Sequence, residues 1–211
     1  MTKIFLTRHG QTIWNLEGRM QGWLDSSLTE LGVNQAQWFG RKIKDMGIDV
    51  IYSSSSGRAV DTADIINRYI GVDINLSDDL REIGLGKLQG LTQEEIKVKY
   101  PDEYNDYYND PVNYIPVGDG ETFNELLMRV QRKFTRIIDE NCDKNILVVT
   151  HTMVIKMLIC MIKNQGIERF WDKPYIRQGS LTVVESINGQ MSLLECADIS
   201  HHKFLVKEFN E

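Results

Sequence analysis

Residues 3–12 read KIFLTRHGQT and combine a short apolar run with a polar cluster. The apolar part, residues 3–7, has the length and composition of a buried strand. In an open α/β sheet, ligands gather beyond the carboxyl ends of the strands, where the loops converge. The stretch therefore predicts a strand and, directly after it, Arg8 and His9 at the edge of a ligand site.

Further along the chain, strand-like segments alternate with helical ones. Two more strands are expected at Asp49–Ser53 and Asn145–Thr150. The turn signal Asn188-Gly189 predicts a hairpin between Leu181–Ser186 and Met191–Leu194. Helical spacing of apolar residues follows Thr29, runs from Val60 to Ile70, and runs from Phe123 to Ile138. This alternation predicts an α/β fold, a three-layer sandwich with a mostly parallel central sheet flanked by helices.

Length and charge limit the possible classes of protein. The 211 residues suit a single domain over residues 1–211 with a modest insertion. With 30 acidic against 24 basic side chains, the net charge of −6 argues against nucleic acid or a membrane surface as partner. The most apolar run, Val154–Ile162, is interrupted by Lys156 and is far shorter than the ~20 residues that span a bilayer. Three scattered cysteines, and a start unlike a signal peptide, predict a cytoplasmic protein whose oligomeric state stays open.

One segment interrupts the alternation of strands and helices. Residues 100–128 contain no Lys, Arg or His, while Pro, Gly, Asp, Asn and Tyr are frequent. We expect an insertion at about residues 91–120, over one end of the sheet and helical near Thr92–Lys99, where Thr92 and Glu95 have the spacing of a capping box. Loops of this length are often functional lids, so the insertion is interpreted as lid-like, with an ordinary surface loop as the alternative.

Three strand-exit loops carry histidine and arginine. Arg8 and His9 follow the first strand, Arg58 follows the second, and His151 follows the third. These loops point to the same end of the sheet, so their side chains are expected to gather there. Histidine titrates near neutrality and the arginine fork matches phosphate geometry, so the group suits a phosphoryl group better than a metal. Each residue taken singly has an alternative as an ordinary polar or solvated side chain.

Two further groups of side chains are open to a functional and a structural interpretation. His201 and His202 lie in a polar, charged C-terminal stretch and are expected to be solvated. The tyrosines of the insertion could form a substrate-facing wall or could simply pack the insertion, and no periodicity distinguishes the two. These are Tyr104, Tyr107, Tyr108 and Tyr114.

Several separated motifs follow the opening stretch in a recognisable order. They are Leu28-Thr29-Glu30-Leu31-Gly32, Tyr52-Ser53-Ser54, Leu80-Arg81-Glu82, Gly86-Lys87-Leu88-Gln89-Gly90, Gly120-Glu121-Thr122 and Val148-Val149-Thr150-His151. With these motifs the chain closely resembles the histidine phosphatase superfamily, the phosphoglycerate-mutase-like family, from roughly Lys3 to His151. A single Arg-His-Gly would be a weak signal, whereas the ordered set is specific.

The resemblance implies a role for each matching residue. His9 would be the nucleophile that becomes a phosphohistidine, and Glu82 would give a proton to the leaving oxygen and later take one from water. Arg8, Arg58 and His151 would complete the catalytic group. The residues that would bind the substrate phosphate are Arg8, Asn15, Gln21, Gly22, Arg58, His151 and Thr152. No metal and no other cofactor is implied, because the arginines supply the positive charge.

The chemistry of the two steps agrees with these roles. Cationic neighbours would lower the pKa of His9 and favour its nucleophilic form. Glu82 must be protonated when the alkoxide leaves, so its pKa should be raised by burial or by a bound dianion.

The last question is whether the phosphoryl group passes to water or back to a substrate. Mutases of this family retain a doubly phosphorylated intermediate and supply an arginine pair in the insertion. The corresponding Tyr104–Asp110 contains no arginine, and its carboxylates would repel a polyanion. We therefore predict a phosphatase for small-molecule phosphomonoesters with a largely uncharged or aromatic-compatible leaving group, of broad or small-metabolite specificity. The alternatives are a cofactor-dependent phosphoglycerate mutase and a non-catalytic module that binds phosphorylated ligands.

Overall fold

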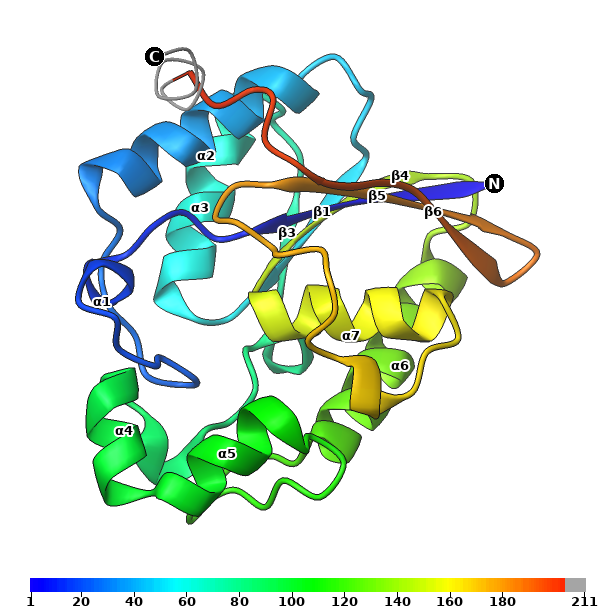
Figure 1. Cartoon of the computed structure of the whole chain (residues 1–211). Helices are drawn as coiled ribbons and strands as arrows, with labels where there is room; N and C mark the ends of the chain where they lie inside the picture. The colour runs from blue at the N-terminus through cyan, green and yellow to red at the C-terminus, as the bar shows by residue number, and fades with distance from the viewer. Residues whose placement is uncertain (204–211) are drawn as a thin grey trace, which may run out of the picture.

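A mixed six-stranded sheet runs through the middle of the protein (Figure 1). The computed structural model describes residues 1–203, and the strand order across the sheet is β3-β2-β4-β1-β5-β6. The strands are β1 (Thr2–Arg8), β2 (Val50–Ser54), β3 (Ile74–Ser77), β4 (Asn145–Thr150), β5 (Leu181–Ile187) and β6 (Gln190–Asp198). The pairs β1/β4, β2/β4 and β2/β3 are parallel. Strand β5 runs antiparallel to β1, and β6 runs antiparallel to β5. The predicted α/β fold is confirmed.

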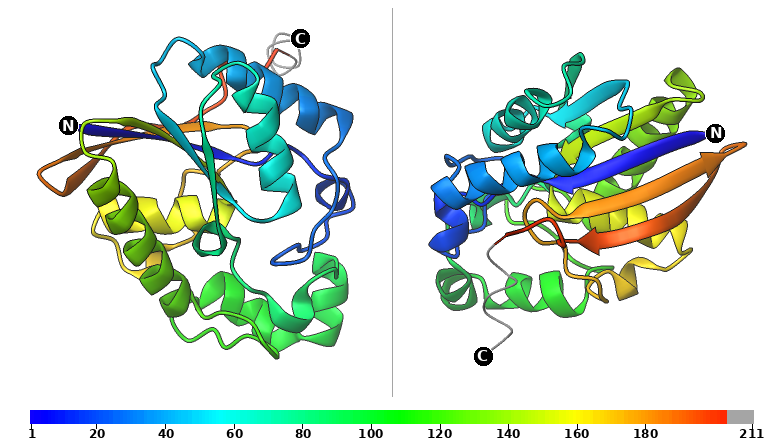
Figure 2. Two further views of the ribbon diagram at one scale, coloured as in Figure 1. Left: turned by 180° about the vertical axis from the view of Figure 1, so that it is seen from behind. Right: turned by 90° about the horizontal axis from the view of Figure 1, so that it is seen from above.

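Helices cover both faces of the sheet and produce the three layers (Figures 1 and 2). Helices α2 (Glu30–Ile43) and α3 (Gly57–Asn67) lie on one face, and α6 (Phe123–Glu140) and α7 (Thr152–Ile162) on the other. The shorter elements are α1 (Ile13–Leu16), α4 (Gln93–Lys99), α5 (Pro101–Asn109) and the 3₁₀ turns η1 (Asp78–Leu80), η2 (Gly86–Leu88) and η3 (Ile167–Arg169). No helix within residues 1–203 is long and apolar enough to cross a membrane.

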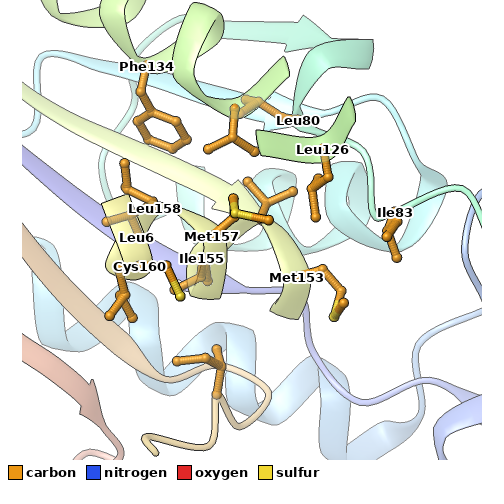
Figure 3. Close-up of a cluster of buried hydrophobic side chains, with 14 of the residues drawn as sticks. Leu6, Leu80, Ile83, Leu126, Phe134, Met153, Ile155, Met157, Leu158 and Cys160 are labelled. Atoms are coloured by element: carbon orange, nitrogen blue, oxygen red, sulfur yellow. The ribbon is translucent and has the colours of Figure 1, made fainter. Parts of the chain in front are cut away.

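Strand β1 is buried on both faces, which explains its near-continuous apolar run. Ile4 and Leu6 belong to the apolar cluster under α6 and α7, and Phe5 belongs to the cluster under α2 and α3. A strand inside a parallel sheet must bury both faces, so it does not alternate polar and apolar residues. Figure 3 shows Leu6 in the first cluster together with Phe134 of α6 and Leu158 of α7.

The predicted start and turn signals take the expected form. Thr29 caps α2 by accepting a hydrogen bond from the Gly32 backbone, and Thr92 forms the predicted capping box with Glu95 at the start of α4. The hairpin turn Asn188-Gly189 has φ values of 52° and 80°, the left-handed backbone that a two-residue turn between β5 and β6 needs.

The insertion is more helical than its composition indicates. Residues 91–120 contain the expected helix α4 and also α5, which was not predicted. Helix α5 begins with Pro101 at its first turn, a position where the missing N–H costs nothing. Whether the segment moves as a lid stays a prediction.

The edge strand β3 was also missed. It has four residues, and Leu76 in its middle is 57% exposed, so no buried apolar pattern marks it. It pairs with β2 and extends the parallel part of the sheet by one strand.

The expectation that His201 and His202 are solvated is wrong. The chain after β6 packs against α2, where the His201 ring lies 5.6 Å from Phe39 and the His202 ring 5.7 Å from Trp38. The Nε2 atoms of both histidines lie within hydrogen-bond distance of the Gly179 carbonyl, at 2.8 and 3.2 Å. Burial lowers the pKa of His202 to about 4. The polar sequence around the pair hid these contacts with aromatic residues distant in the chain.

Candidate active site

The loops that leave β1, β2 and β4 meet at one end of the sheet. Parallel pairing places Arg8 opposite Thr150, and the His9 backbone N–H donates to the Thr150 carbonyl at 3.0 Å. The next residue on each strand is therefore a histidine facing its counterpart, with 5.1 Å between the ring centroids of His9 and His151. Arg58, at the start of α3, reaches both rings. The structure thus brings together the four side chains that follow the predicted strands.

His9 is held so that one ring nitrogen faces the cationic groups. Its Nδ1 lies 2.8 Å from the Gly10 carbonyl, so Nδ1 carries the proton and Nε2 carries the lone pair. Arg58 Nε donates to that Nε2 at 3.3 Å. Burial, and after it the charges of Arg58 and Arg8, lower the pKa of His9 well below 6.5. The imidazole is therefore neutral at neutral pH.

Gly10 fixes this loop through close packing. A Cβ built at Gly10 would lie 2.4 Å from the Gly32 carbonyl oxygen at the start of α2. The Gly10 backbone N–H also donates to Thr62 of α3 at 3.1 Å. Only glycine permits this approach, and the turn that carries His9 is thereby anchored to two helices.

Arg58 is 1% exposed and ties the site to the loop before α2. Its guanidinium donates to the Gly22 carbonyl at 2.8 Å, the Leu24 carbonyl at 2.7 Å and the Asp25 carboxylate at 2.8 Å. The same carboxylate accepts the Arg58 backbone N–H at 3.2 Å, so an anion stands at the N-terminus of α3. This anion offsets the unfavourable position of a cation in the first turn of a helix.

His151 lies behind Arg58 rather than in the wall of the cavity. It is fully buried, and its Nδ1 accepts from Arg58 Nη2 at 3.2 Å. Its Nε2 lies 2.8 Å from the Ser54 hydroxyl, which fixes the ring from the other side. Burial and then the charge of Arg58 lower the pKa of His151 well below 6.5, so the ring is neutral and orients Arg58.

Arg8 lines the cavity and carries one buried donor without a partner. Its Nη1 donates to the Ile176 carbonyl at 3.0 Å, while its Nε is buried and has no hydrogen-bond partner among residues 1–203. Arg8 therefore brings a positive charge to the cavity wall, and its Nε is one of several buried polar atoms without a partner within residues 1–203.

Glu82 supplies a half-buried carboxyl group at the same cavity. Burial raises its pKa above 4.5. The opposing contributions are smaller and come from the Ile83 N–H at 3.0 Å, the charges of Arg58 and Arg8, and the Met153 N–H at 3.1 Å. A raised pKa suits a group that must carry a proton before it gives one away.

These side chains surround a cavity of about 320 Å³. All the candidate site residues except His151 line it: Arg8, His9, Asn15, Gln21, Gly22, Arg58, Glu82 and Thr152. No group of His, Cys, Asp or Glu suited to hold a metal ion is found within the described part of the chain.

An aromatic wall forms a further part of the cavity. Its members are Trp14, Tyr107, Tyr108, Trp171 and Tyr175. Tyr107 and Tyr108 thus face the site, whereas Tyr104 and Tyr114 pack the insertion, Tyr114 being 1% exposed. Trp171 and Tyr175 were missed because they follow α7 by several residues without a recognisable motif. Their indole and phenol reach the cavity through tertiary contacts, such as the hydrogen bond from Trp171 Nε1 to the Tyr107 carbonyl at 2.7 Å.

Comparisons with known proteins agree with this architecture. The family model of the histidine phosphatase superfamily (branch 1) matches residues 4–199. The chain is 33% identical over 203 residues to the metal-independent phosphoserine phosphatase of Arabidopsis thaliana, covering 95% of this chain and 83% of that one. It is 36% identical over 158 residues to phosphoglycerate mutase-like protein 4 of the same plant, covering 74% and 69%. The solved structure of Bacillus stearothermophilus YhfR matches with a TM-score of 0.92 and 36% identity, over 95% of this chain and 99% of that one.

Proposed function

The chain belongs to the histidine phosphatase superfamily and is a phosphoric monoester hydrolase, and we propose that it works through a phosphohistidine on His9. The observation that carries this proposal is the orientation of the His9 ring, with Nδ1 on the Gly10 carbonyl and Nε2 beside Arg58. A nucleophile needs a lone pair aimed at the reacting atom, and cations beside it neutralise the phosphoryl oxygens.

In the first step, the His9 Nε2 lone pair attacks phosphorus and the bond between phosphorus and the leaving oxygen breaks. Glu82 gives its proton to that oxygen, so an alcohol departs rather than an alkoxide. The positive charges of Arg58 and Arg8 stabilise the equatorial phosphoryl oxygens while the charge develops. Burial raises the pKa of Glu82, which favours its protonated form and supports its role as the acid.

In the second step, the Glu82 carboxylate takes a proton from water and the water oxygen attacks phosphorus. The bond between Nε2 and phosphorus breaks, inorganic phosphate leaves, and both residues return to their starting states. No other group has to supply charge or protons, so we expect the reaction to need no metal.

The cavity favours a largely uncharged, aromatic-compatible leaving group. Five aromatic side chains line the cavity, and residues 100–128 carry no basic side chain. One further cation, Arg19, lines the cavity, but its Nε is paired with Glu17 at 2.7 Å. A substrate with two phosphates and a carboxylate would find little positive charge beyond the phosphoryl site, so a phosphatase is favoured over a mutase.

The purified protein is expected to release inorganic phosphate from p-nitrophenyl phosphate in the presence of a chelator. Added 3-phosphoglycerate should be converted to 2-phosphoglycerate slowly, if at all, relative to hydrolysis. The assay measures both free phosphate and the two phosphoglycerates. Rapid interconversion with little free phosphate would contradict the phosphatase assignment and establish a mutase.

The rate is expected to be highest on the acid side of neutrality. The pKa of His9 is lowered well below 6.5 by burial and by Arg58 and Arg8, so the nucleophile stays unprotonated as the pH falls below neutrality. The pKa of Glu82 is raised above 4.5 by burial, so the acid loses its proton only as the pH rises through this raised pKa. With benzyl phosphate, whose alcohol must be protonated as it leaves, a profile of kcat/KM from about pH 4 to about pH 9 should therefore fall on its alkaline side.

The Glu82→Gln variant provides the baseline for this profile. The substrate phosphate titrates with a pKa of about 6 in either enzyme, so it affects both profiles alike. The alkaline decline that Glu82 causes should be absent in the variant. An identical decline in both enzymes would assign it to the substrate and not to Glu82.

A further inference from the structure

We propose that Glu121 and Arg129 are positioning residues that hold the general acid Glu82 in place, an inference that rests on the proposed function. Glu82 lies between η1 and η2 in a segment without regular secondary structure. Such a segment gets no order from a helix or sheet, so other contacts must fix the carboxyl group to within the fraction of an ångström that proton transfer needs.

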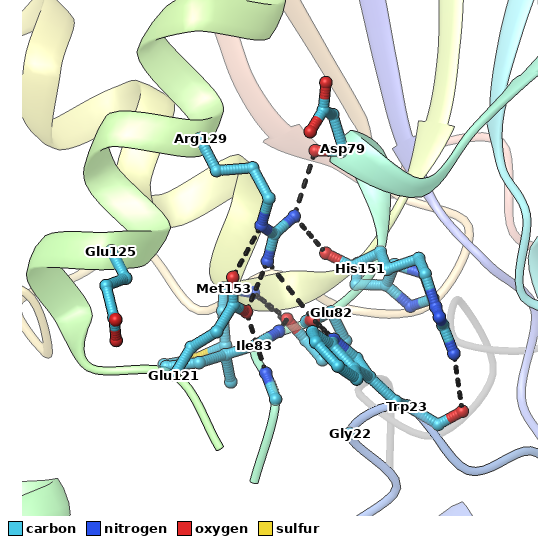
Figure 4. Close-up of polar contacts among 12 residues, drawn as sticks. Gly22, Trp23, Asp79, Glu82, Ile83, Glu121, Glu125, Arg129, His151 and Met153 are labelled. Atoms are coloured by element: carbon cyan, nitrogen blue, oxygen red, sulfur yellow. Dashed lines mark hydrogen bonds and ion pairs between the residues drawn. The ribbon is translucent and has the colours of Figure 1, made fainter. Parts of the chain in front are cut away.

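Arg129 projects from α6 and binds three carbonyls of this segment (Figure 4). Its Nη1 donates to the carbonyls of Asp79 and Arg81, both at 2.9 Å, and its Nη2 donates to the carbonyl of Glu82 at 3.3 Å. The remaining N–H groups bind Glu121 side-on, with Nε to Oε1 at 2.7 Å and Nη2 to Oε2 at 2.6 Å. All five donors of the guanidinium are therefore in use.

Glu121 holds the other side of Glu82. Its Oε2 accepts the Gly84 N–H at 2.9 Å, and its own backbone N–H donates to the Gly84 carbonyl at 2.7 Å. The segment is thus fixed two residues after Glu82 by Glu121, and at Glu82 and before it by Arg129. The side chains of Arg129 and Glu121 are only 11% and 13% exposed, so their ion pair is largely shielded from water.

The pair acts on the placement of Glu82 rather than on its charge. The pKa of Glu82 is set by burial, by the Ile83 and Met153 N–H groups, and by Arg58 and Arg8. Two further contacts belong to the same frame: Trp23 Nε1 donates to the Glu82 carbonyl at 2.9 Å, and the Thr150 hydroxyl donates to the Leu80 carbonyl at 2.7 Å. The backbone of Glu82 is therefore held from α6, from β4 and from the loop that carries Trp23.

The test compares two aromatic substrates that differ in their need for an acid. Benzyl phosphate releases an alcohol that must be protonated, whereas p-nitrophenyl phosphate releases an acidic phenol that needs no proton. General acid catalysis contributes about 10²–10⁴-fold where it is needed. In Arg129→Lys, which keeps the charge but has only three donors, kcat/KM for benzyl phosphate should fall about tenfold or more, and that for p-nitrophenyl phosphate less than about threefold.

Arg132→Lys is the matched control. Arg132 lies on the same helix, is 67% exposed and pairs with the Asp79 side chain at 2.9 Å. Its replacement should leave the ratio of the two kcat/KM values unchanged. If Arg129→Lys does not fold, Glu121→Asp serves instead, because the shorter carboxylate cannot reach Arg129 and the Gly84 N–H together, and the same shift in ratio is expected.

The outcomes separate this inference from the function beneath it. A folded Arg129→Lys or Glu121→Asp enzyme that loses activity equally on both substrates, or on neither, would overturn the positioning role. Glu82→Gln should itself lower kcat/KM for benzyl phosphate far more than kcat/KM for p-nitrophenyl phosphate. If Glu82→Gln lowers both kcat/KM values equally, the proposed acid role of Glu82 fails, whatever the Arg129 and Glu121 variants do.

Discussion

Replacing His9 with alanine is expected to lower kcat for p-nitrophenyl phosphate by about 10⁴-fold or more, because loss of a nucleophile removes the covalent route altogether. His9 Nε2 is the ring nitrogen beside Arg58, and its partner Nδ1 is bound to the Gly10 carbonyl. Alanine leaves no lone pair at that position. The measurement is the steady-state rate together with rapid quenching of the enzyme with labelled substrate.

The quenched wild-type enzyme should carry an acid-labile, base-stable label, as expected of a phosphohistidine, and His9→Ala should carry none. The control is the binding of inorganic phosphate, which should persist in the variant because Arg8 and Arg58 remain. A wild-type enzyme that binds phosphate but takes up no label and releases no product would be a binding module instead. A labelled His9→Ala protein would place the nucleophile on another residue.

The sequence predicts that four side chains lie close together, because their positions follow from the order of the strands. These are Arg8, His9, Arg58 and His151. Each of these residues comes soon after a parallel strand, and parallel strands put their carboxyl ends on one side of a sheet. The local signals that fix these strands are short apolar runs, which a single sequence shows well. Glu82 could not be placed in this way, because the short, exposed strand β3 that precedes it was not predicted, and Glu82 was identified only through the resemblance.

The parts that could not be predicted depend on contacts between distant segments. Trp171 and Tyr175 reach the cavity from a stretch after α7, and nothing in the local sequence separates a cavity-lining aromatic residue from a packing one. His202 was expected to be solvated because its neighbours in the sequence are polar. In the structure it is only 3% exposed, and its ring packs beside Trp38. Arg129 has helical neighbours typical of a charged surface, and only the tertiary structure shows that its guanidinium is buried over the backbone around Glu82.

Replacing Arg58 with methionine is expected to lower kcat/KM by about 10³-fold, because the side chain combines charge stabilisation with positioning. Its guanidinium contacts both His9 and His151, and it also holds the Gly22 carbonyl and the Asp25 carboxylate. Methionine has a similar length but no donor and no charge. The measurement is kcat and KM with p-nitrophenyl phosphate, together with the affinity for vanadate as a mimic of the trigonal phosphoryl group.

The decisive comparison is with Arg58→Lys, which keeps the charge. If charge alone mattered, lysine would restore most of the activity. The geometry argues otherwise, because one ammonium group cannot reach His9, His151 and the Gly22 carbonyl at once, so we expect Arg58→Lys to remain about 10²-fold below the wild type. Arg68→Lys, at the exposed C-terminal end of the same helix, should match the wild type. Full activity in Arg58→Lys would show that the several donors of the guanidinium are dispensable and that Arg58 acts only as a point charge.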